Sequence, residues 1–213
     1  MRFVDRTGAG EALAEALSGR VEGDDPVVLG IPRGGVVVAA AVARALELPL
    51  DVVVPRKLGA PHNPELGIGA IAPGVRVLDV RMVRALGVSR AYIEEEVARQ
   101  EAEIARRMQT YRVGRPPLEL EGRLVHIVDD GVATGGTAIA AVRWAKARNA
   151  QRVALAVPVA PPQTLAALSR EADEVVALEA PSGFGSVGEW YERFDQTSDE
   201  EVIGLLAGGG TVG

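Results

Sequence analysis

The stretch from Arg123 to Thr137 reads RLVHIVDDGVATGGT and decides the fold class of the chain. It begins with a short apolar run, residues 124–128, of the kind that forms a strand buried on both faces. Asp129 and Asp130 follow directly, where such a strand would end. Seven small, glycine-rich or hydroxyl-bearing residues come next, and the segment AIAAVRWAKA after them has apolar positions at helical spacing. The stretch therefore predicts a strand, a tight turn and a helix N-terminus in direct succession.

A turn of this kind is suited to bind an anion. Glycines let the backbone N–H groups point inward, and the helix dipole favours negative charge at the helix N-terminus. Thr134 and Thr137 add hydroxyl donors. Because Asp129 and Asp130 would repel a bare phosphate, they require a metal ion or groups that donate hydrogen bonds, such as sugar hydroxyls. A phosphate cradle beside an acidic pair describes a site for ribose 5-phosphate.

The segment VDDGVATGGT resembles the signature of the type I phosphoribosyltransferases, whose shared substrate is phosphoribosyl pyrophosphate with magnesium. The resemblance implies that Asp129 and Asp130 bind the 2- and 3-hydroxyls of the ribose and help to position Mg²⁺, which binds mainly through the donor substrate. It also implies that the 5-phosphate is held by the turn that follows, with the residues Gly131, Ala133, Thr134, Gly135, Gly136 and Thr137.

Two other interpretations of this stretch are open. An ordinary turn between a strand and a helix could carry acids that merely cap the helix. A P-loop is the closer alternative, because Gly131 and Gly136 have its spacing. No lysine precedes Thr137, however, so the residue that would reach the outer phosphates is missing.

Strand and helix patterns alternate along most of the chain. Residues 6–18 predict a first helix, and short apolar runs after it predict parallel strands. The helical patterns between these strands, at 36–47 among others, predict right-handed crossovers. We therefore expect an α/β fold with a five-stranded parallel sheet flanked by helices, in a core of residues 1–180. Ligands of such sheets bind at the carboxyl ends of the strands. The expected strands are 26–31, 51–55, 123–128, 152–158 and 174–179.

Two further loops lie at strand ends in this scheme. The segment GIPRGG at 30–35 resembles the pyrophosphate loop of the family, with Arg33, Gly34 and Gly35 as binding residues. The resemblance implies a cis peptide bond there, which we expect between Arg33 and Gly34. Arg56 and Lys57 follow the next strand and stand where the family places a pair that reaches the pyrophosphate. Arg33, Lys57 and the two aspartates are thus the expected catalytic residues.

The alternation stops between residues 59 and 121, which we expect to form an insertion. Residues 59–74 have a loop-like composition, and residues 89–112 predict a long helix that begins at Ser89. The insertion is open to three interpretations: a lid, a dimer arm or plain packing. The letters GIGAIA at 67–72 fit a dinucleotide-binding pattern, but no convincing strand precedes them, so we reject such a site.

Residues 181–213 differ in composition and predict a small hood and a tail. Four aromatic residues lie within eleven positions, and we expect Tyr191 or Phe194 to face a flat acceptor base and the others to pack. A mini-core for a small subdomain explains the same cluster equally well. The glycine-rich end, 208–213, predicts disorder.

Composition narrows the function classes. The chain has 213 residues, a 47% hydrophobic share, no cysteine and a net charge of −6. An acidic chain argues against nucleic acid or a membrane as the main partner, and the lack of cysteine fits a reducing cytoplasm.

We therefore expect a pentosyltransferase that moves ribose 5-phosphate from phosphoribosyl pyrophosphate to an unidentified nitrogenous acceptor, as in nucleotide metabolism, with Mg²⁺ as cofactor. Purine-salvage members often carry an aspartate where this chain has Ala133, which disfavours a 6-oxopurine acceptor. A homodimer is common among relatives. The alternatives are a non-catalytic regulator that binds the same donor, and another phosphosugar or nucleotide enzyme such as a hydrolase.

Overall fold

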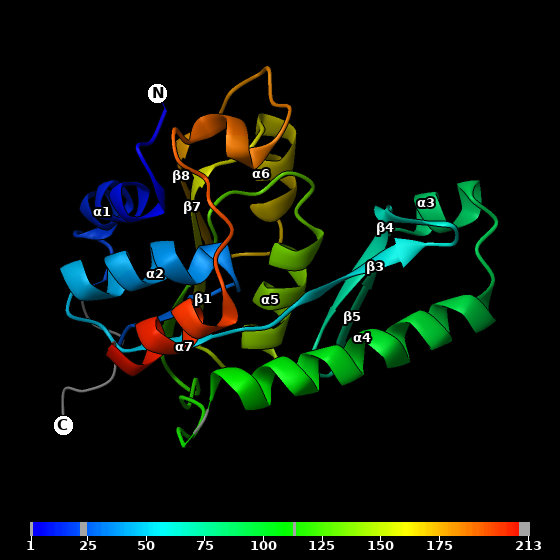
Figure 1. The fold of residues 1–213 in the computed structure, drawn as a ribbon, viewed down its shortest axis with the longest axis horizontal. Helices are drawn as coiled ribbons and strands as arrows, with labels where there is room; N and C mark the ends of the chain where they lie inside the picture. Colours follow the sequence, from blue (N-terminus) through cyan, green and yellow to red (C-terminus); the bar gives the residue numbers. More distant parts are fainter. Residues whose placement is uncertain (1, 22–24, 113, 209–213) are drawn as a thin grey trace.

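Five parallel strands form the central sheet of the protein (Figure 1). The computed structural model describes residues 2–21, 25–112 and 114–208. Neighbouring strands are parallel throughout, which confirms the predicted five-stranded parallel sheet. In spatial order the strands are β2 (Leu50–Val52), β1 (Val27–Gly30), β6 (Leu124–Val128), β7 (Arg152–Val159) and β8 (Glu174–Glu179).

Helices cover both faces of this sheet (Figure 1). The first pair, α1 (Arg6–Leu17) and α2 (Gly34–Ala45), packs on one face, and the second pair, α5 (Gly136–Lys146) and α6 (Pro162–Leu168), packs on the other. Alternate strand residues belong to the two cores: Val28 packs with the first pair and Leu29 with the second. Because both faces are covered, the strands are apolar at nearly every position, as parallel strands require.

The insertion forms an arm that extends away from the central sheet (Figure 1). It consists of the antiparallel strands β3 (Arg56–Ala60), β4 (Asn63–Ala72) and β5 (Val75–Leu78), and of α3 (Val80–Ala85) and α4 (Arg90–Tyr111). The prediction of a loop at 59–74 is wrong, because most of this segment is strand. Two of its glycines reflect close packing: a Cβ on Gly59 would lie 2.8 Å from the Cα of Pro64, and one on Gly69 would collide with the carbonyl oxygen of Val77 on the neighbouring strand. Gly74, with φ at +77°, lies in the turn between β4 and β5.

The long helix α4 begins where the sequence predicts. Ser89 Oγ accepts a hydrogen bond from the backbone N–H of Tyr92 at 3.2 Å, and this side chain caps the helix. The apolar stripe of α4 packs into the same core as β3 and β4. On its polar face Arg107 Nε donates to Glu103 Oε1 at 2.7 Å, and Arg99 Nε donates to Glu96 Oε2 at 2.9 Å.

The N-terminal residues contact the segment before the last helix, beside the sheet. Phe3 forms a parallel bridge with Tyr191, just after the short 3₁₀ helix η1 (Val187–Trp190). The last helix, α7 (Asp199–Gly208), packs against α2 and α4. Ser198 Oγ caps it by accepting a hydrogen bond from the backbone N–H of Glu201 at 3.1 Å. Disorder is expected for residues 208–213, but Gly208 is the last residue of α7, and residues 209–213 lie outside the described residues. The division into a core of residues 1–180 and a hood of residues 181–213 stays a prediction.

Membrane insertion through a helix finds no support in the described ranges. Across residues 2–21, 25–112 and 114–208, no helix combines the length and the apolar character that crossing a bilayer needs.

His126 makes the stability of the fold depend on pH. Its ring is buried in β6, no described residue bonds either ring nitrogen, and burial lowers its pKa from 6.5 to about 4. Between these values the unfolded chain binds a proton that the folded chain does not, so stability falls as the pH falls from about 6.5 to about 4.

We predict that His126→Asn removes up to about 3 kcal/mol of this dependence, as urea unfolding at pH 7, 5.5 and 4.5 would measure. His62→Asn is the matched control because His62 is exposed at a turn. A pH-independent difference between wild type and His126→Asn would contradict the assignment.

Candidate functional site

Three loops meet at the carboxyl-terminal edge of the central sheet. They follow β1, β2 and β6, which are adjacent in the sheet. Their first residues are tied together by backbone hydrogen bonds: the N–H of Ile31 donates to the carbonyl of Val128 at 2.9 Å, and that of Val53 to the carbonyl of Gly30 at 3.1 Å. The sheet order therefore brings the 31–35 loop directly beside the acidic pair.

The acidic pair lies at the end of β6 and is largely shielded from solvent. Asp129 Oδ1 accepts a hydrogen bond from the backbone N–H of Asp130 at 2.9 Å. Burial raises the pKa of Asp129 well above its usual range, and the neighbouring charge of Asp130 adds to this effect. Burial also raises the pKa of Asp130, against the opposing effect of Arg6. A ligand that donates hydrogen bonds or positive charge to the two carboxylates would therefore stabilise their ionised forms.

Gly34 and Gly35 pack directly against the two carboxylates. A Cβ on Gly34 would collide with the carboxylate of Asp130, and a Cβ on Gly35 would lie 2.7 Å from Asp129 Oδ1. The absence of side chains at these positions thus lets the loop after β1 approach the end of β6. The cis peptide bond of this loop joins Pro32 and Arg33, so its expected position between Arg33 and Gly34 is wrong by one residue.

The glycine-rich turn after the acidic pair leads into α5, as predicted. Gly135 has a left-handed conformation, with φ at +86°, and immediately precedes the first residue of the helix. Ala133 and Thr134 are exposed at the turn, and Thr164 Oγ1 of α6 fixes it by donating to the carbonyl of Ala133 at 2.6 Å. The backbone N–H groups at the start of α5 are therefore presented on a held, accessible turn.

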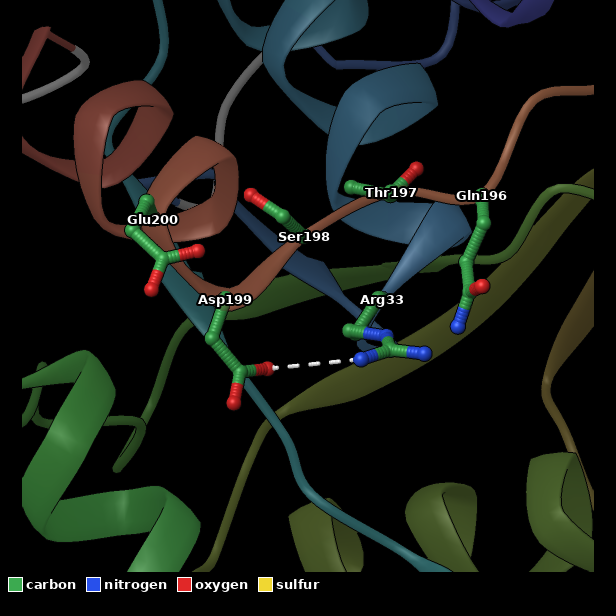
Figure 2. Close-up of a pocket in the computed structure, with 6 residues that line it drawn as sticks. All are labelled: Arg33, Gln196, Thr197, Ser198, Asp199 and Glu200. Atoms are coloured by element: carbon green, nitrogen blue, oxygen red, sulfur yellow. Dashed lines mark ion pairs between the residues drawn. The ribbon is translucent and has the colours of Figure 1, made fainter.

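Arg33 lines a pocket of about 320 Å³ together with residues 196–200 (Figure 2). Figure 2 shows the Arg33 guanidinium and the Asp199 carboxylate pointing toward one another, at 3.9 Å. Asp199 Oδ1 also accepts a hydrogen bond from the Tyr111 hydroxyl at 2.7 Å. An anion bound at Arg33 would compete with Asp199 for this guanidinium.

Arg56 and Lys57 are the first residues of the arm and are engaged by other arm residues. Arg56 Nε donates to Gln100 Oε1 at 2.9 Å, and Lys57 Nζ lies 3.2 Å from Glu65 Oε2. Lys57 pairs across the hairpin with Ala70, whose Cβ lies 3.7 Å from a Cβ placed on Gly136. Paired residues share a face of the sheet, so this face of the arm lies against the start of α5.

The hood residues lie beside the acidic pair, but Tyr191 does not present its ring to a ligand. Tyr191 is buried, its ring lies 5.6 Å from that of Phe3, and its hydroxyl donates to the carbonyl of Asp130 at 2.5 Å. Phe194 is 38% exposed, and its ring is contacted by Tyr191 at 5.0 Å between centroids. Tyr191 thus supports the acidic pair from behind, and Phe194 is the more accessible of the two.

Sequence analysis missed one residue of this site, Arg6. Its Nε donates to Asp130 Oδ2 at 2.7 Å from the start of α1. The two residues are 124 positions apart, and no local pattern around Arg6 signals this contact. An arginine in the first turn of a helix is usually on the surface, so only the folded chain identifies it.

Metal binding by the protein alone finds no support in the described part of the chain. Among residues 2–21, 25–112 and 114–208, no three His, Asp or Glu side chains are grouped so that they could hold an ion. The adjacent carboxylates of Asp129 and Asp130 suit Mg²⁺ only where a ligand supplies further oxygens, which is how Mg²⁺ commonly binds with phosphorylated substrates.

Comparison with known families matches residues 6–193 to the phosphoribosyl transferase domain. The chain belongs to this family. The match confirms the resemblance to type I phosphoribosyltransferases, a family of pentosyltransferases, and it includes all three loops of the site.

Individual relatives agree with the family assignment. A Mycobacterium tuberculosis protein named "Putative phosphoribosyl transferase Rv0571c" is 48% identical over 205 residues, which cover 96% of this chain and 46% of that protein. The chain thus spans about half the length of the curated relatives it matches. Adenine phosphoribosyltransferase of M. tuberculosis is 35% identical over 157 residues, covering 74% of this chain and 57% of that protein. The crystal structure of TT1426 from Thermus thermophilus aligns at 45% identity with a TM-score of 0.83, covering 99% of this chain and 100% of that one.

The close approach of the 31–35 loop to the acidic pair predicts an intolerance to side chains at Gly34. We predict that Gly34→Ala destabilises the protein by about 1–3 kcal/mol, because the added methyl group must displace the Asp130 carboxylate or the loop. Gly183→Ala is the control, because a Cβ there meets nothing within 4 Å. Urea unfolding of both variants measures the effect. Equal stability of Gly34→Ala and wild type would show that the two loops are not packed as described.

Proposed function

We propose that this protein is a phosphoribosyltransferase that transfers ribose 5-phosphate from phosphoribosyl pyrophosphate, the donor, to a small nitrogenous acceptor. One observation carries the proposal: a shielded pair of carboxylates and a glycine-rich turn at a helix N-terminus adjoin in one site, beside the 31–35 loop. A sugar phosphate needs this combination, because its hydroxyls donate hydrogen bonds whereas its phosphate accepts them.

The ribose 5-phosphate moiety would span the end of β6 and the turn after it. Asp129 and Asp130 would accept hydrogen bonds from the 2- and 3-hydroxyls. The backbone N–H groups of residues 133–137, with the hydroxyls of Thr134 and Thr137, would bind the 5-phosphate. Gly131, Gly135 and Gly136 shape this turn.

The pyrophosphate would bind on the other side of the acidic pair, at the 31–35 loop. Arg33 would contact it through its guanidinium, and Gly34 and Gly35 through their backbone N–H groups. Lys57 and Arg56 would reach it only after leaving Glu65 and Gln100, so we propose that the arm moves when the donor binds. Mg²⁺, held by the donor oxygens with Asp129 and Asp130, would neutralise charge on the departing pyrophosphate.

The reaction would be a displacement at C1 of the ribose. The acceptor nitrogen supplies the electron pair of the new C1–N bond, and the C1–O bond breaks with its electron pair leaving on pyrophosphate. Ala133 stands where a proton-handling aspartate would otherwise be available, so the acceptor proton leaves to solvent or to another group of the bound substrates. The protein contributes by orienting the reactants and by stabilising the developing charge.

The acceptor would enter from the hood side, where Phe194 is the accessible aromatic residue. The relative named adenine phosphoribosyltransferase acts on a nucleobase by its name. A nitrogenous base is thus the acceptor class that we propose, within nucleotide metabolism in the cytoplasm. The homodimer stays a prediction.

Release of pyrophosphate tests the proposal. The protein would be incubated with the donor, Mg²⁺ and a panel of purine and pyrimidine bases, and pyrophosphate would be assayed. Acceptor-dependent release is the expected result. Donor binding without release for any base would instead indicate a binding protein, and release of phosphate or pyrophosphate without an acceptor would indicate a hydrolase.

The acidic pair gives the sharpest mutational test. We predict that Asp130→Asn weakens donor binding by about 10- to 100-fold, because a neutral amide accepts hydrogen bonds from hydroxyls less strongly than a carboxylate does. Asp173→Asn is the control, because Asp173 forms an ion pair with Lys146 at 2.8 Å, at the opposite end of α5. Isothermal titration with donor and Mg²⁺ measures both. Wild-type affinity in Asp130→Asn would remove the assignment of the pair to the sugar hydroxyls.

A further inference from the structure

Arg6 lies where α1, the acidic pair and the hood meet. Its Nε donates to Asp130 Oδ2 at 2.7 Å, and its Nη1 donates to the backbone carbonyl of Asp195 at 2.7 Å. The side chain is 12% exposed. Its bond to Asp130 is partly buried, whereas its bond to Asp195 is exposed. A charge-assisted hydrogen bond in this environment is stronger and more strictly oriented than a surface ion pair.

Two further contacts restrict the position of the guanidinium. Its Cζ lies 3.8 Å from the centre of the Phe194 ring, within the range of a cation–π interaction. On another side, a Cβ placed on Gly34 would lie 2.6 Å from Nε, so the bare glycine provides the space that Arg6 occupies. The guanidinium thus contacts all three parts of the site: the acidic pair, the 31–35 loop and the hood.

The start of α1 fixes the backbone that carries Arg6. Asp5 caps the helix by accepting a hydrogen bond from the backbone N–H of Gly8 at 3.0 Å, and Ala9 on the next turn is fully buried. Arg6 therefore reaches Asp130 from an anchored helix rather than from a loose terminus.

We propose that Arg6 is a positioning residue for the donor, an inference that rests on the proposed function. By engaging Oδ2 it fixes the orientation of the Asp130 carboxylate, so that the remaining oxygen is directed at the ribose hydroxyls. By bonding the carbonyl of Asp195 and stacking on one face of the Phe194 ring, it also holds the hood against the sugar site. Arg6 itself touches neither the pyrophosphate nor the reacting atoms in this scheme.

The alternative is that Arg6 only adds positive charge or only stabilises the fold. These roles differ in what they predict for two ligands. Loss of orientation at Asp130 weakens ligands that have ribose hydroxyls, whereas loss of charge weakens pyrophosphate at least as strongly, because pyrophosphate carries more charge than a sugar monophosphate. Ribose 5-phosphate and inorganic pyrophosphate, each with Mg²⁺, are therefore the probes.

Three variants complete the experiment. Arg6→Gln removes the charge and the guanidinium, and Arg6→Lys keeps the charge but cannot reproduce the two bonds and the stacking of the planar group. Arg193→Gln is the matched control: Arg193 ties the hood to Asp5 at 2.5 Å, so it joins the same two segments, yet it is exposed and bonds Asp5 rather than the acidic pair. Dissociation constants for both probes would be measured by titration, with thermal unfolding alongside.

We expect Arg6→Gln to bind ribose 5-phosphate about 10- to 100-fold more weakly and pyrophosphate within about threefold of wild type. Arg6→Lys should fall between Arg6→Gln and wild type for ribose 5-phosphate, and Arg193→Gln should match wild type for both probes. Full rescue by lysine, or equal losses for the two probes, would overturn the positioning role. If Arg6→Gln does not fold, the comparison of Arg6→Lys with Arg193→Gln decides between the same outcomes.

Failure of the inference is distinguishable from failure of the proposed function. If wild type binds ribose 5-phosphate and Arg6→Gln binds it equally well, only the role of Arg6 is wrong. If wild type binds neither probe, the proposed function is wrong, and the inference is wrong with it.

Discussion

Two carboxylates side by side at the end of a buried strand constrain everything around them. Burial and mutual repulsion both oppose their ionisation, so a fold that keeps them needs compensation at that point. Two contacts compensate: the Arg6 guanidinium donates to the Asp130 carboxylate, and the Asp130 backbone N–H donates to the Asp129 carboxylate. The Tyr191 hydroxyl fixes the backbone beside the pair by donating to the Asp130 carbonyl. These contacts do not fully offset the cost of ionising the pair, because the pKa of each carboxyl stays raised. A ligand with hydroxyls or a bound cation would offset the rest of this cost.

This constraint also explains why the N-terminal segment packs against residues 190–195. Arg6 lies in the first helix, α1, and Tyr191 lies in the segment before the last helix, α7. Both side chains donate a hydrogen bond to Asp130. Backbone hydrogen bonds between Phe3 and residues 190–192 hold these two segments together, and the Phe3 and Tyr191 rings are in contact. The first helix and the segment around Tyr191 thus both support the acidic pair. A C-terminal segment alone would lack the guanidinium.

The predictable parts of this protein are those that local sequence determines. Strands buried on both faces appear as apolar runs, and Asp129, Asp130 and the glycines after them lie next to one another in the chain, so both the sheet and the central motif could be predicted. The hairpin at 56–72 could not, because its glycines indicate turns in the sequence although Gly69 serves the close approach of two strands. Arg6 could not be predicted either, because its partners lie more than 120 residues away. Tyr191 was assigned to the right region, but whether its ring packs or faces a ligand depends on Phe3, at the other end of the chain.

The most direct test of the sugar-phosphate site is a crystal structure of the protein with ribose 5-phosphate and Mg²⁺ bound. We expect the 2- and 3-hydroxyl oxygens to lie within hydrogen-bonding distance of Asp129 and Asp130, about 2.5–3.0 Å, while the phosphate rests on the backbone N–H groups of residues 133–137. A sugar phosphate bound elsewhere, or one whose phosphate occupies the turn while its hydroxyls face away from both aspartates, would contradict this assignment.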